Sequence, residues 1–199
     1  MFVFVANYVV KLSTKNTLDS FYCVFGFQTI GGSDNMETKK TYGYYGGKFF
    51  PMHKGHLYCI ETMAKMCDEG HIILFINGVQ EKNYLQNHPP NSFLSIKSRI
   101  AQIQKVCKMY PNLQYHIIDC ANLVKSDGTE DWDAETPLVR QFLPHVDYIF
   151  SSEIAYDGYF KRAFPEAKHI LVDTERIIIP ISATKIREMN EEERKKWMV

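Results

Sequence analysis

The sequence has no excess of charge of either sign. Its 199 residues include 23 Lys and Arg residues and 23 Asp and Glu residues, so the net charge is zero when the histidines are neutral. A domain that holds DNA or RNA normally carries a basic excess, because it must neutralise many phosphates. The balance therefore argues against a nucleic-acid partner, although a few well-placed cations are enough to hold a small phosphorylated ligand.

Cysteines are few, and long hydrophobic runs are lacking. The cysteines are Cys23, Cys59, Cys67, Cys107 and Cys120. They are odd in number and form no CxxC pair, which argues against a disulfide framework or a zinc site and favours reduced thiols in a cytoplasmic protein. The apolar opening MFVFVANYVV is far shorter than the roughly 20 residues of a membrane span and lacks the basic flank and cleavage site of a secretory signal. We therefore expect no membrane partner.

The sequence also lacks internal repeats and low-complexity tracts, and its length suits one ordinary domain. Residues 1–40 differ from the rest, because their apolar start is followed by a polar stretch and by the turn-forming GGSDN. We interpret residues 1–40 as an N-terminal extension of unknown role, either a hairpin or a disordered arm. Residues 41–199 are then the domain proper.

Strand-like and helix-like segments alternate after residue 40. The strands are expected at 41–46, 71–76, 113–119, 146–152 and 168–173, and the helices at 55–67, 94–110, 136–143, 156–164 and 182–190. Residues 71–76, HIILFI, are continuously apolar, as is typical of a parallel strand buried on both faces. Pro137 suits the first turn of its helix. The alternation predicts an α/β fold: a Rossmann-like, doubly wound, mainly parallel sheet with helices on both faces.

The stretch GGKFFPMHKGH, Gly46–His56, follows the first of these strands, at the edge where open α/β sheets bind ligands. We expect its glycines to allow close approach and unusual φ angles, and the helix that begins near Gly55 to offer free N–H groups to an anion. The three-residue spacing of His53 and His56 lets both imidazoles reach one neighbourhood. As neutral donors or as cations, they can hold phosphate oxygens and stabilise charge on a leaving pyrophosphate.

Six positions of this stretch resemble the GxFxPxHxGH signature of the nucleotidylyltransferase superfamily: Gly47, Phe49, Pro51, His53, Gly55 and His56. Six fixed residues match by chance with a frequency on the order of 10⁻⁸ per start position at average composition. ISATKIR, Ile181–Arg187, similarly resembles the carboxy-terminal ISxTxIR motif of this family. Both motifs are complete and in the family's order, and the resemblance runs from Tyr42 to about Met189.

Details of the first motif are more similar to nicotinamide mononucleotide adenylyltransferases than to other branches. Cytidylyltransferases typically have Asp where Phe50 stands and lack the proline and first histidine, and phosphopantetheine adenylyltransferases usually have Thr where His53 stands. GKFFPMHKGH, YIFSSE and LVDTERIIIPISATKIRE particularly resemble the adenylyltransferase domain of bacterial bifunctional NAD-biosynthesis proteins that also carry a ribosylnicotinamide kinase. We expect no kinase half here, because the chain has no GxxxxGK[ST] loop and stops soon after Arg187.

The resemblance implies a site with two halves. It implies His53, His56 and Arg187 as catalytic residues, with the imidazoles at the α-phosphoryl centre and the second motif on the pyrophosphate portion. The ATP-binding set is Gly47, Lys48, Phe49, Phe50, His53, Gly55, His56, Ser152, Ile181, Ser182, Thr184 and Arg187, and the acceptor-binding set is Trp132 and Arg176. Trp132, in the polar loop GTEDWDAETP, would stack on a nicotinamide ring, as family members use an aromatic for that purpose.

These residues also have plain structural interpretations. His53 and His56 would be satisfied structural residues, or a two-histidine metal site that lacks a convincing third ligand, so no protein-held metal is predicted. Ser182 would simply cap a helix, Lys48 would be solvated, and Trp132 would anchor its loop. The closing NEEERKKWMV is most simply a solvated helical tail.

The main hypothesis is adenylyl transfer, in which the 5′-phosphate of nicotinamide mononucleotide attacks the α-phosphorus of ATP in line and gives NAD and pyrophosphate. That phosphate is already ionised, so positioning and charge stabilisation suffice, and Mg²⁺ would accompany ATP with few protein ligands. Two alternatives stay open: the same transfer to nicotinate mononucleotide, FMN, phosphopantetheine or a sugar phosphate, and a nucleotide-sensing module without turnover. A homo-oligomer is also left open.

Overall fold

The computed structural model describes residues 2–5, 8–11, 39–88 and 91–199, which belong to two compact units, Met1–Glu37 and Thr38–Val199. In the first unit, strands β1 (Phe2–Val5) and β2 (Tyr8–Lys11) pair antiparallel. The predictions made for residues 12–38, and the state of Cys23, lie outside the described residues. All further description concerns the second unit.

A five-stranded parallel sheet forms the centre of the second unit, in the order β5-β4-β3-β6-β7. Its strands are β3 (Tyr42–Gly47), β4 (Glu69–Ile76), β5 (Leu113–Asp119), β6 (Tyr148–Ser151) and β7 (Lys168–Leu171). The carboxyl ends of parallel strands meet at one edge, and the loop after β3 lies where the winding direction reverses. This topology confirms the predicted Rossmann-like, doubly wound fold.

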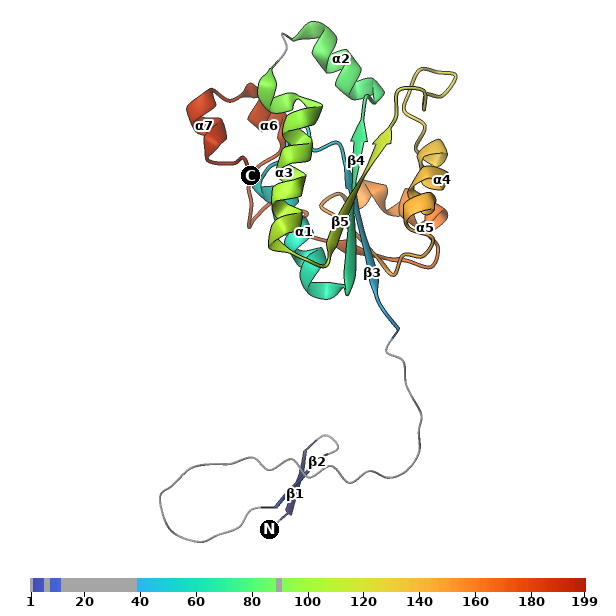
Figure 1. Ribbon diagram of the computed structural model, residues 1–199, viewed down its shortest axis with the longest axis vertical. Helices are drawn as coiled ribbons and strands as arrows, with labels where there is room; N and C mark the ends of the chain where they lie inside the picture. The colour runs from blue at the N-terminus through green and yellow to red at the C-terminus, as the bar shows by residue number, and fades with distance from the viewer. Residues whose placement is uncertain (1, 6–7, 12–38, 89–90) are drawn as a thin grey trace. The chain divides into compact units, whose positions relative to one another are not determined.

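Helices cover both faces of this sheet. They are α1 (Lys54–Met66), α2 (Val79–Asn87), α3 (Ile96–Met109), α4 (Trp132–Phe142), α5 (Asp157–Ala163), α6 (Ala183–Glu188) and α7 (Glu191–Lys195), with short 3₁₀ turns at Ser92–Leu94 and Ile154–Tyr156. Figure 1 shows α4 and α5 on one side of the strands and α1 and α3 on the other. No helix in the described part of the chain combines the length and apolar character needed to cross a bilayer.

Alternation along β4 divides the core into two layers. Ile72 and Leu74 pack in one cluster with Ile60 of α1, whereas Ile73 packs in another with Val139 of α4. All five side chains are at most 1% exposed. Because this strand is buried on both faces, its sequence is continuously apolar instead of alternating.

Helix α4 begins earlier than the sequence predicted. The prediction started at residue 136, with Pro137 in the first turn and Trp132 in a loop, but the helix begins at Trp132 itself. Asp131 is the N-cap, and its side chain accepts a hydrogen bond from the Ala134 amide (3.2 Å), which makes a firm helix start. Pro137 therefore lies inside the helix, where its missing N–H costs a bond to the Asp133 carbonyl.

The carboxyl-terminal segment was predicted as a solvated tail, and this is wrong for its last three residues. The Trp197 carbonyl accepts a hydrogen bond from the Lys54 amide (2.9 Å), Met198 forms a β-bridge with His53, and Val199 packs against the core on the α1 side. Backbone atoms make the first two contacts, so the side-chain pattern gave no sign of them. The end of the chain thereby braces the start of α1.

A fully buried ion pair supports the loop after β3. Arg99 of α3 is 0% exposed and forms two hydrogen bonds with the carboxylate of Glu81 on α2. Its Nη1 also donates to the Lys48 carbonyl (2.9 Å), and Glu81 accepts a further bond from the Asn77 amide (3.2 Å). The pair thus joins two helices to the loops that follow β3 and β4.

Replacing Arg99 by Met should lower the free energy of unfolding by about 3–5 kcal/mol, because the Glu81 carboxylate is then buried without its cation. Urea unfolding followed by circular dichroism measures this change. The matched control is Lys97→Met on the same helix, where the side chain is exposed and the expected change is below about 0.5 kcal/mol. Equal unfolding midpoints for the two variants would contradict the supporting role of the pair.

Candidate active site

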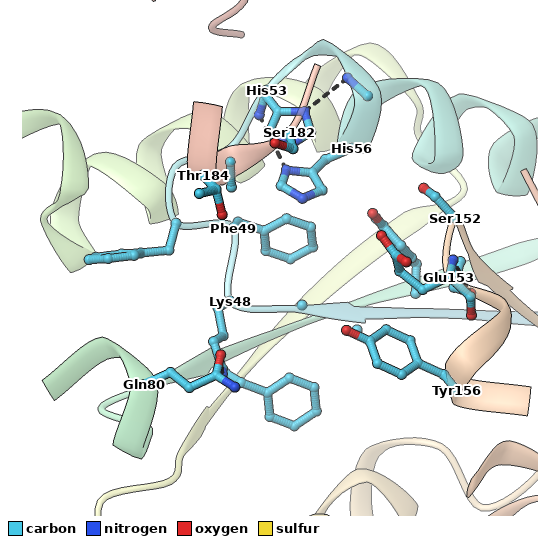
Figure 2. Close-up of a pocket in the computed structure, with 18 of the residues that line it drawn as sticks. Lys48, Phe49, His53, His56, Gln80, Ser152, Glu153, Tyr156, Ser182 and Thr184 are labelled. Atoms are coloured by element: carbon cyan, nitrogen blue, oxygen red, sulfur yellow. Dashed lines mark hydrogen bonds between the residues drawn. The ribbon is translucent and has the colours of Figure 1, made fainter. Parts of the chain in front are cut away.

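The functional residues predicted from the sequence line one cavity at the carboxyl edge of the sheet. The cavity has a volume of about 440 Å³, within the range of small-ligand sites. Figure 2 shows His53, His56, Ser182 and Thr184 gathered at one end of it. The predicted residues that line it are Gly47, Lys48, Phe49, Phe50, His53, Gly55, His56, Trp132, Ser152, Arg176, Ile181, Ser182, Thr184 and Arg187.

The two histidines form a capping box at the start of α1. His53 is the N-cap, and its Nδ1 accepts a hydrogen bond from the Gly55 amide (3.1 Å), while His56 Nδ1 accepts one from the His53 amide (3.3 Å). The two rings are stacked, with centroids 3.7 Å apart. The three-residue spacing thus brings the imidazoles together, and the helix-end hydrogen bonds fix their orientation.

Both imidazoles are neutral. An Nδ1 atom that accepts a hydrogen bond carries no proton, so each ring holds its proton on Nε2. Burial, with a smaller contribution from Arg176, lowers the pKa of His53 to about 4. Burial, followed by the effects of His53 and Arg176, lowers the pKa of His56 well below its ordinary value. Of the two states that the sequence left open, the structure favours neutral donors over cations.

The start of α1 offers fewer free amides than the sequence predicted. The Lys54 amide donates to the Trp197 carbonyl (2.9 Å), the Gly55 amide to the His53 ring, and the Leu57 amide to the His53 carbonyl (3.0 Å). These donors are therefore used within the protein. We infer that anion binding at this helix end relies on the imidazole Nε2–H groups more than on the backbone.

The glycines of the first motif provide space and not an unusual backbone conformation. Among the described glycines only Gly128 has a positive φ, and the positive φ within the motif belongs to Phe49 (45°). The expectation of unusual glycine φ angles was therefore wrong. At Gly55 the reason for glycine is steric, because an added Cβ would lie 2.9 Å from Cε1 of the His53 ring and would displace the N-cap.

The second motif is held against the first by Arg187. Ser182 caps α6 and accepts a hydrogen bond from the Lys185 amide (3.3 Å). Arg187 Nη1 donates to the Phe50 carbonyl (2.6 Å), and its Nη2 donates to Thr184 Oγ1 (3.1 Å). No carboxylate in residues 39–88 or 91–199 forms an ion pair with this guanidinium, so its charge is available to an anion in the cavity.

A tight loop after β7 sets the position of Arg176. The carboxylate of Asp173 accepts hydrogen bonds from the amides of Ile177–Ile179, at 2.8 to 3.0 Å. Asp173 and Arg176 both adopt positive φ angles, 50° and 52°. Arg176 Nη1 then donates to the Ile181 carbonyl (2.8 Å) and its Nη2 to the Glu153 carboxylate (2.5 Å). Arg176 is thereby tied to the second motif and to the loop after β6.

Lys48 is engaged by neighbouring polar groups, contrary to its solvated interpretation. Its Nζ donates to Gln80 Oε1 and to the Glu130 carboxylate, both at 2.8 Å. Glu130 also accepts hydrogen bonds from the Gln80 amide (3.2 Å) and from Trp132 Nε1 (3.5 Å). The ion pair of Lys48 and Glu130 thus links the loop after β3 to the loop before α4 in the wall of the cavity.

The cavity wall near α4 is aromatic and acidic. Trp132 packs edge to face with Tyr156 and Tyr159, with ring centroids 5.3 and 5.6 Å apart. Figure 2 shows Tyr156 at the opposite end of the site from His53. Glu135, one helical turn after Trp132, lines the same cavity. One end of the cavity therefore carries imidazoles and hydroxyls, and the other carries aromatic rings and carboxyl groups.

Sequence reasoning missed several residues that line the cavity: Gln80, Glu81, Tyr84, Glu130, Glu135, Tyr156 and Tyr159. The first three belong to α2 (Val79–Asn87), whose sequence has too few apolar residues for a helical period to stand out. Glu135 could have been found from its spacing, because residues three apart share a helix face once the helix starts at Trp132.

Comparison with known protein families agrees with this geometry. A family profile described as Cytidylyltransferase-like matches residues 44–189, which is most of the chain. The chain belongs to the cytidylyltransferase-like family. This membership confirms the resemblance to nucleotidylyltransferases that the two motifs indicated. The chemistry of that family is nucleotidyl transfer.

Individual relatives of this chain are longer proteins than the chain itself. The trifunctional NAD biosynthesis/regulator protein NadR of Escherichia coli is 27% identical over 166 residues, which are 79% of this chain and 38% of that protein. The chain therefore spans well under half the length of this relative. Two crystal structures share the fold: a NadR protein in complex with NAD and AMP-PNP (TM-score 0.58, 22% identity, 79% of this chain and 44% of the other), and a bifunctional NMN adenylyltransferase/ADP ribose pyrophosphatase from Francisella tularensis (TM-score 0.53, 19% identity, 75% and 41%).

The depressed pKa of His53 predicts a loss of stability at acid pH. The unfolded chain takes up this proton near pH 6.5 and the folded chain only near pH 4. The free energy of unfolding should therefore fall as the pH drops from about 6.5 to about 4, by about 3 kcal/mol for this group alone. Urea unfolding at pH 7.5 and pH 4.5 measures the difference.

His53→Asn is the matched variant for this experiment, because asparagine keeps an N-cap acceptor but does not titrate. The pH dependence of its stability should be flatter than that of the wild type over the same interval. If both proteins lost the same stability between pH 7.5 and pH 4.5, the neutral state of His53 would be disproved.

Proposed function

We propose that the chain is an adenylyltransferase that joins ATP and nicotinamide mononucleotide to give NAD and pyrophosphate. The hydrogen bond from Arg187 to the Phe50 carbonyl carries this proposal, because it brings the hydroxyls and guanidinium of the second motif to the cavity that holds the imidazoles. The names of the curated relatives, which refer to NAD biosynthesis, support it. Residues 41–199 would carry the activity, with residues 1–40 as an extension.

The phosphates of ATP fit the end of the cavity where the two helices start. Nε2–H groups of His53 and His56 would donate to the α-phosphoryl group and to the leaving oxygen. Ser182, Thr184 and Arg187 offer two hydroxyls and a guanidinium that pairs with no carboxylate of the described residues for the β- and γ-phosphates. All five groups line the same cavity, so one triphosphate can engage both motifs.

The adenosine of ATP fits beside the end of β6. Ser152 Oγ lies 3.4 Å from Cys59 Sγ of α1, which ties this loop to the first helix. The Ser151 hydroxyl accepts a hydrogen bond from the Glu153 amide (3.2 Å), so the turn that follows the strand is itself fixed. A planar base packed on this wall would leave its phosphates at the start of α1.

The reaction then needs positioning and charge stabilisation. An oxygen of the acceptor's 5′-phosphate attacks the α-phosphorus, the bond from that phosphorus to the α,β-bridging oxygen breaks, and pyrophosphate leaves with the electron pair. The attacking phosphate is ionised at neutral pH, so no side chain has to remove a proton. Neutral imidazole donors near the leaving oxygen stabilise the charge that develops there.

A divalent cation fits this site as a companion of the triphosphate. Among the described residues, no three His, Cys, Asp or Glu side chains lie close enough together to form a metal site. The carboxylates of Glu153 and Asp173, which line the cavity, are engaged by Arg176 and by backbone amides. Mg²⁺ held by the phosphate oxygens of ATP would lower the charge of the triphosphate, which is its usual mode of binding.

The ring of the acceptor fits the aromatic and acidic end of the cavity. The nicotinamide ring of the mononucleotide is a pyridinium cation, which the face of Trp132 attracts. The neighbouring carboxylate of Glu135, which forms no ion pair with the described residues, favours the same charge. FMN, phosphopantetheine and sugar phosphates carry no such cation. We assign Arg176, which lies between this end and the second motif, to the acceptor's phosphate.

A panel of substrates tests the proposal. Pyrophosphate release is measured with ATP or CTP and, in turn, with nicotinamide mononucleotide, nicotinate mononucleotide, FMN, phosphopantetheine and a sugar phosphate. Release with ATP and a pyridine mononucleotide, and with no other pair, is the expected result. Release with CTP or with another acceptor would overturn the assignment of substrates, and tight ATP binding without any release would make the protein a nucleotide-sensing module.

Replacing His56 by Ala should lower kcat by about 10²- to 10³-fold, because one donor to the developing charge is lost. The Kd for ATP, measured by calorimetry, should change far less, since the second motif still holds the phosphates. The matched control is His145→Ala, whose imidazole bonds to Asp147 outside the cavity and whose kcat should stay at the wild-type value. A wild-type kcat in His56→Ala would count decisively against the mechanism.

A further inference from the structure

Glu135 is a buried carboxyl group that forms no ion pair with any cation in the described part of the chain. Its side chain is 9% exposed, and the hydrogen-bond donor that it has within the described residues is the thiol of Cys120 (Sγ to Oε1, 3.5 Å). The neighbouring cation, Lys48, is bound at 2.8 Å by both Glu130 and Gln80. When it is ionised, Glu135 therefore brings to the cavity a negative charge that no described cation balances. When it is protonated, it brings a hydrogen-bond donor.

Glu135 and Trp132 lie on the same face of α4, three residues apart, and both line the cavity. Residues at this spacing are neighbours on a helix surface, so we expect the substituent of a pyridine ring stacked on Trp132 to lie near the Glu135 carboxyl group. That substituent is the part in which two pyridine mononucleotides differ. It is a neutral carboxamide in nicotinamide mononucleotide and a carboxylate in nicotinate mononucleotide.

We propose that Glu135 is a specificity-determining residue, which favours an acceptor with a carboxamide over one with a carboxylate. The inference rests on the proposed function for the chemical class of the acceptor. A carboxamide NH₂ can donate a hydrogen bond to the Glu135 carboxylate. A carboxylate substituent would instead bring a second negative charge beside it, with no free cation between them, so the two charges repel or a proton must be taken up.

The preference should depend on pH. Burial raises the pKa of Glu135 to about 7. The titratable and charged groups that face it are Cys120 after β5, Glu130 and Asp131 before α4, Lys48 after β3, Tyr44 on β3 and Tyr159 on α5. The pKa values of the thiol and of both tyrosines are raised and that of Glu130 is lowered, so these four groups keep one charge state between pH 6 and pH 8. Protonated Glu135, below pH 7, can donate to a carboxylate, and the preference then shrinks.

Calorimetry with the full chain and each of the two mononucleotides tests this inference. The wild type should bind nicotinamide mononucleotide about tenfold more tightly than nicotinate mononucleotide at pH 8, with a smaller ratio at pH 6. Glu135→Gln, which keeps the size of the side chain, should bring the ratio near one at pH 8 and remove its pH dependence. The matched control, Asp133→Asn, removes a charge from the same helix at a side chain that is 60% exposed and pairs with Arg162. It should keep the wild-type ratio.

Each outcome decides for or against the inference. An unchanged ratio in Glu135→Gln, or a wild-type preference for the carboxylate, would overturn it. If circular dichroism showed that the variant does not fold, the wild-type pH dependence would decide alone, and a ratio independent of pH would overturn it. Selective binding without pyrophosphate release would refute adenylyl transfer but support the role of Glu135, whereas binding of neither mononucleotide would overturn both.

Discussion

The hydrogen bond from Arg187 to the Phe50 carbonyl is the contact on which the rest of the site depends. It joins residues 137 positions apart and holds the short helix α6 against the loop after β3. It thereby helps to set the position of the Ser182 and Thr184 hydroxyls relative to the imidazoles of α1. The contact is available because β3 and β7 are parallel strands of one sheet, so the loops that leave their carboxyl ends emerge at the same edge.

The loop that carries Phe50 is itself held by groups far away in the sequence. The Arg99 side chain donates a hydrogen bond to the Lys48 carbonyl, and the Trp197 carbonyl accepts one from the Lys54 amide at the start of α1. Because these backbone groups are satisfied within the protein, the start of α1 can be buried while the imidazole Nε2–H groups are kept for a ligand. Donors fixed in this way need little reorganisation when charge develops on a bound phosphate, which is the condition for electrostatic catalysis.

The strand patterns were sufficient to predict the sheet and its carboxyl edge, because they are local properties, and the resemblance of the two motifs to a known family indicated which residues would gather there. The sequence was insufficient where a distant or competing contact decides. Helix α4 begins after its N-cap Asp131 and not near Pro137, where the sequence predicted its start. Because of this wrong helix start, the sequence did not reveal that Trp132 and Glu135 share a helix face. The contact of the chain's end is made by a backbone carbonyl of Trp197, which no side-chain pattern reveals. The positive φ of Phe49 is likewise imposed by the packed loop and not by residue type.

The unequal ends of the cavity also set the direction in which substrates would bind. In the proposed function, neutral N–H donors and the guanidinium of Arg187, which pairs with no carboxylate of the described residues, would attract phosphates at one end. Trp132 and the Glu135 carboxylate would attract a cationic ring at the other. A triphosphate placed in reverse would bring several negative charges against the buried Glu135 carboxylate, which is costly at low effective dielectric. In the proposed reaction, the acceptor's phosphate would then point toward the imidazoles, where it would meet the α-phosphorus. The line of attack in the proposed reaction would thus follow from the charge distribution, before any side chain acts on the reacting atoms.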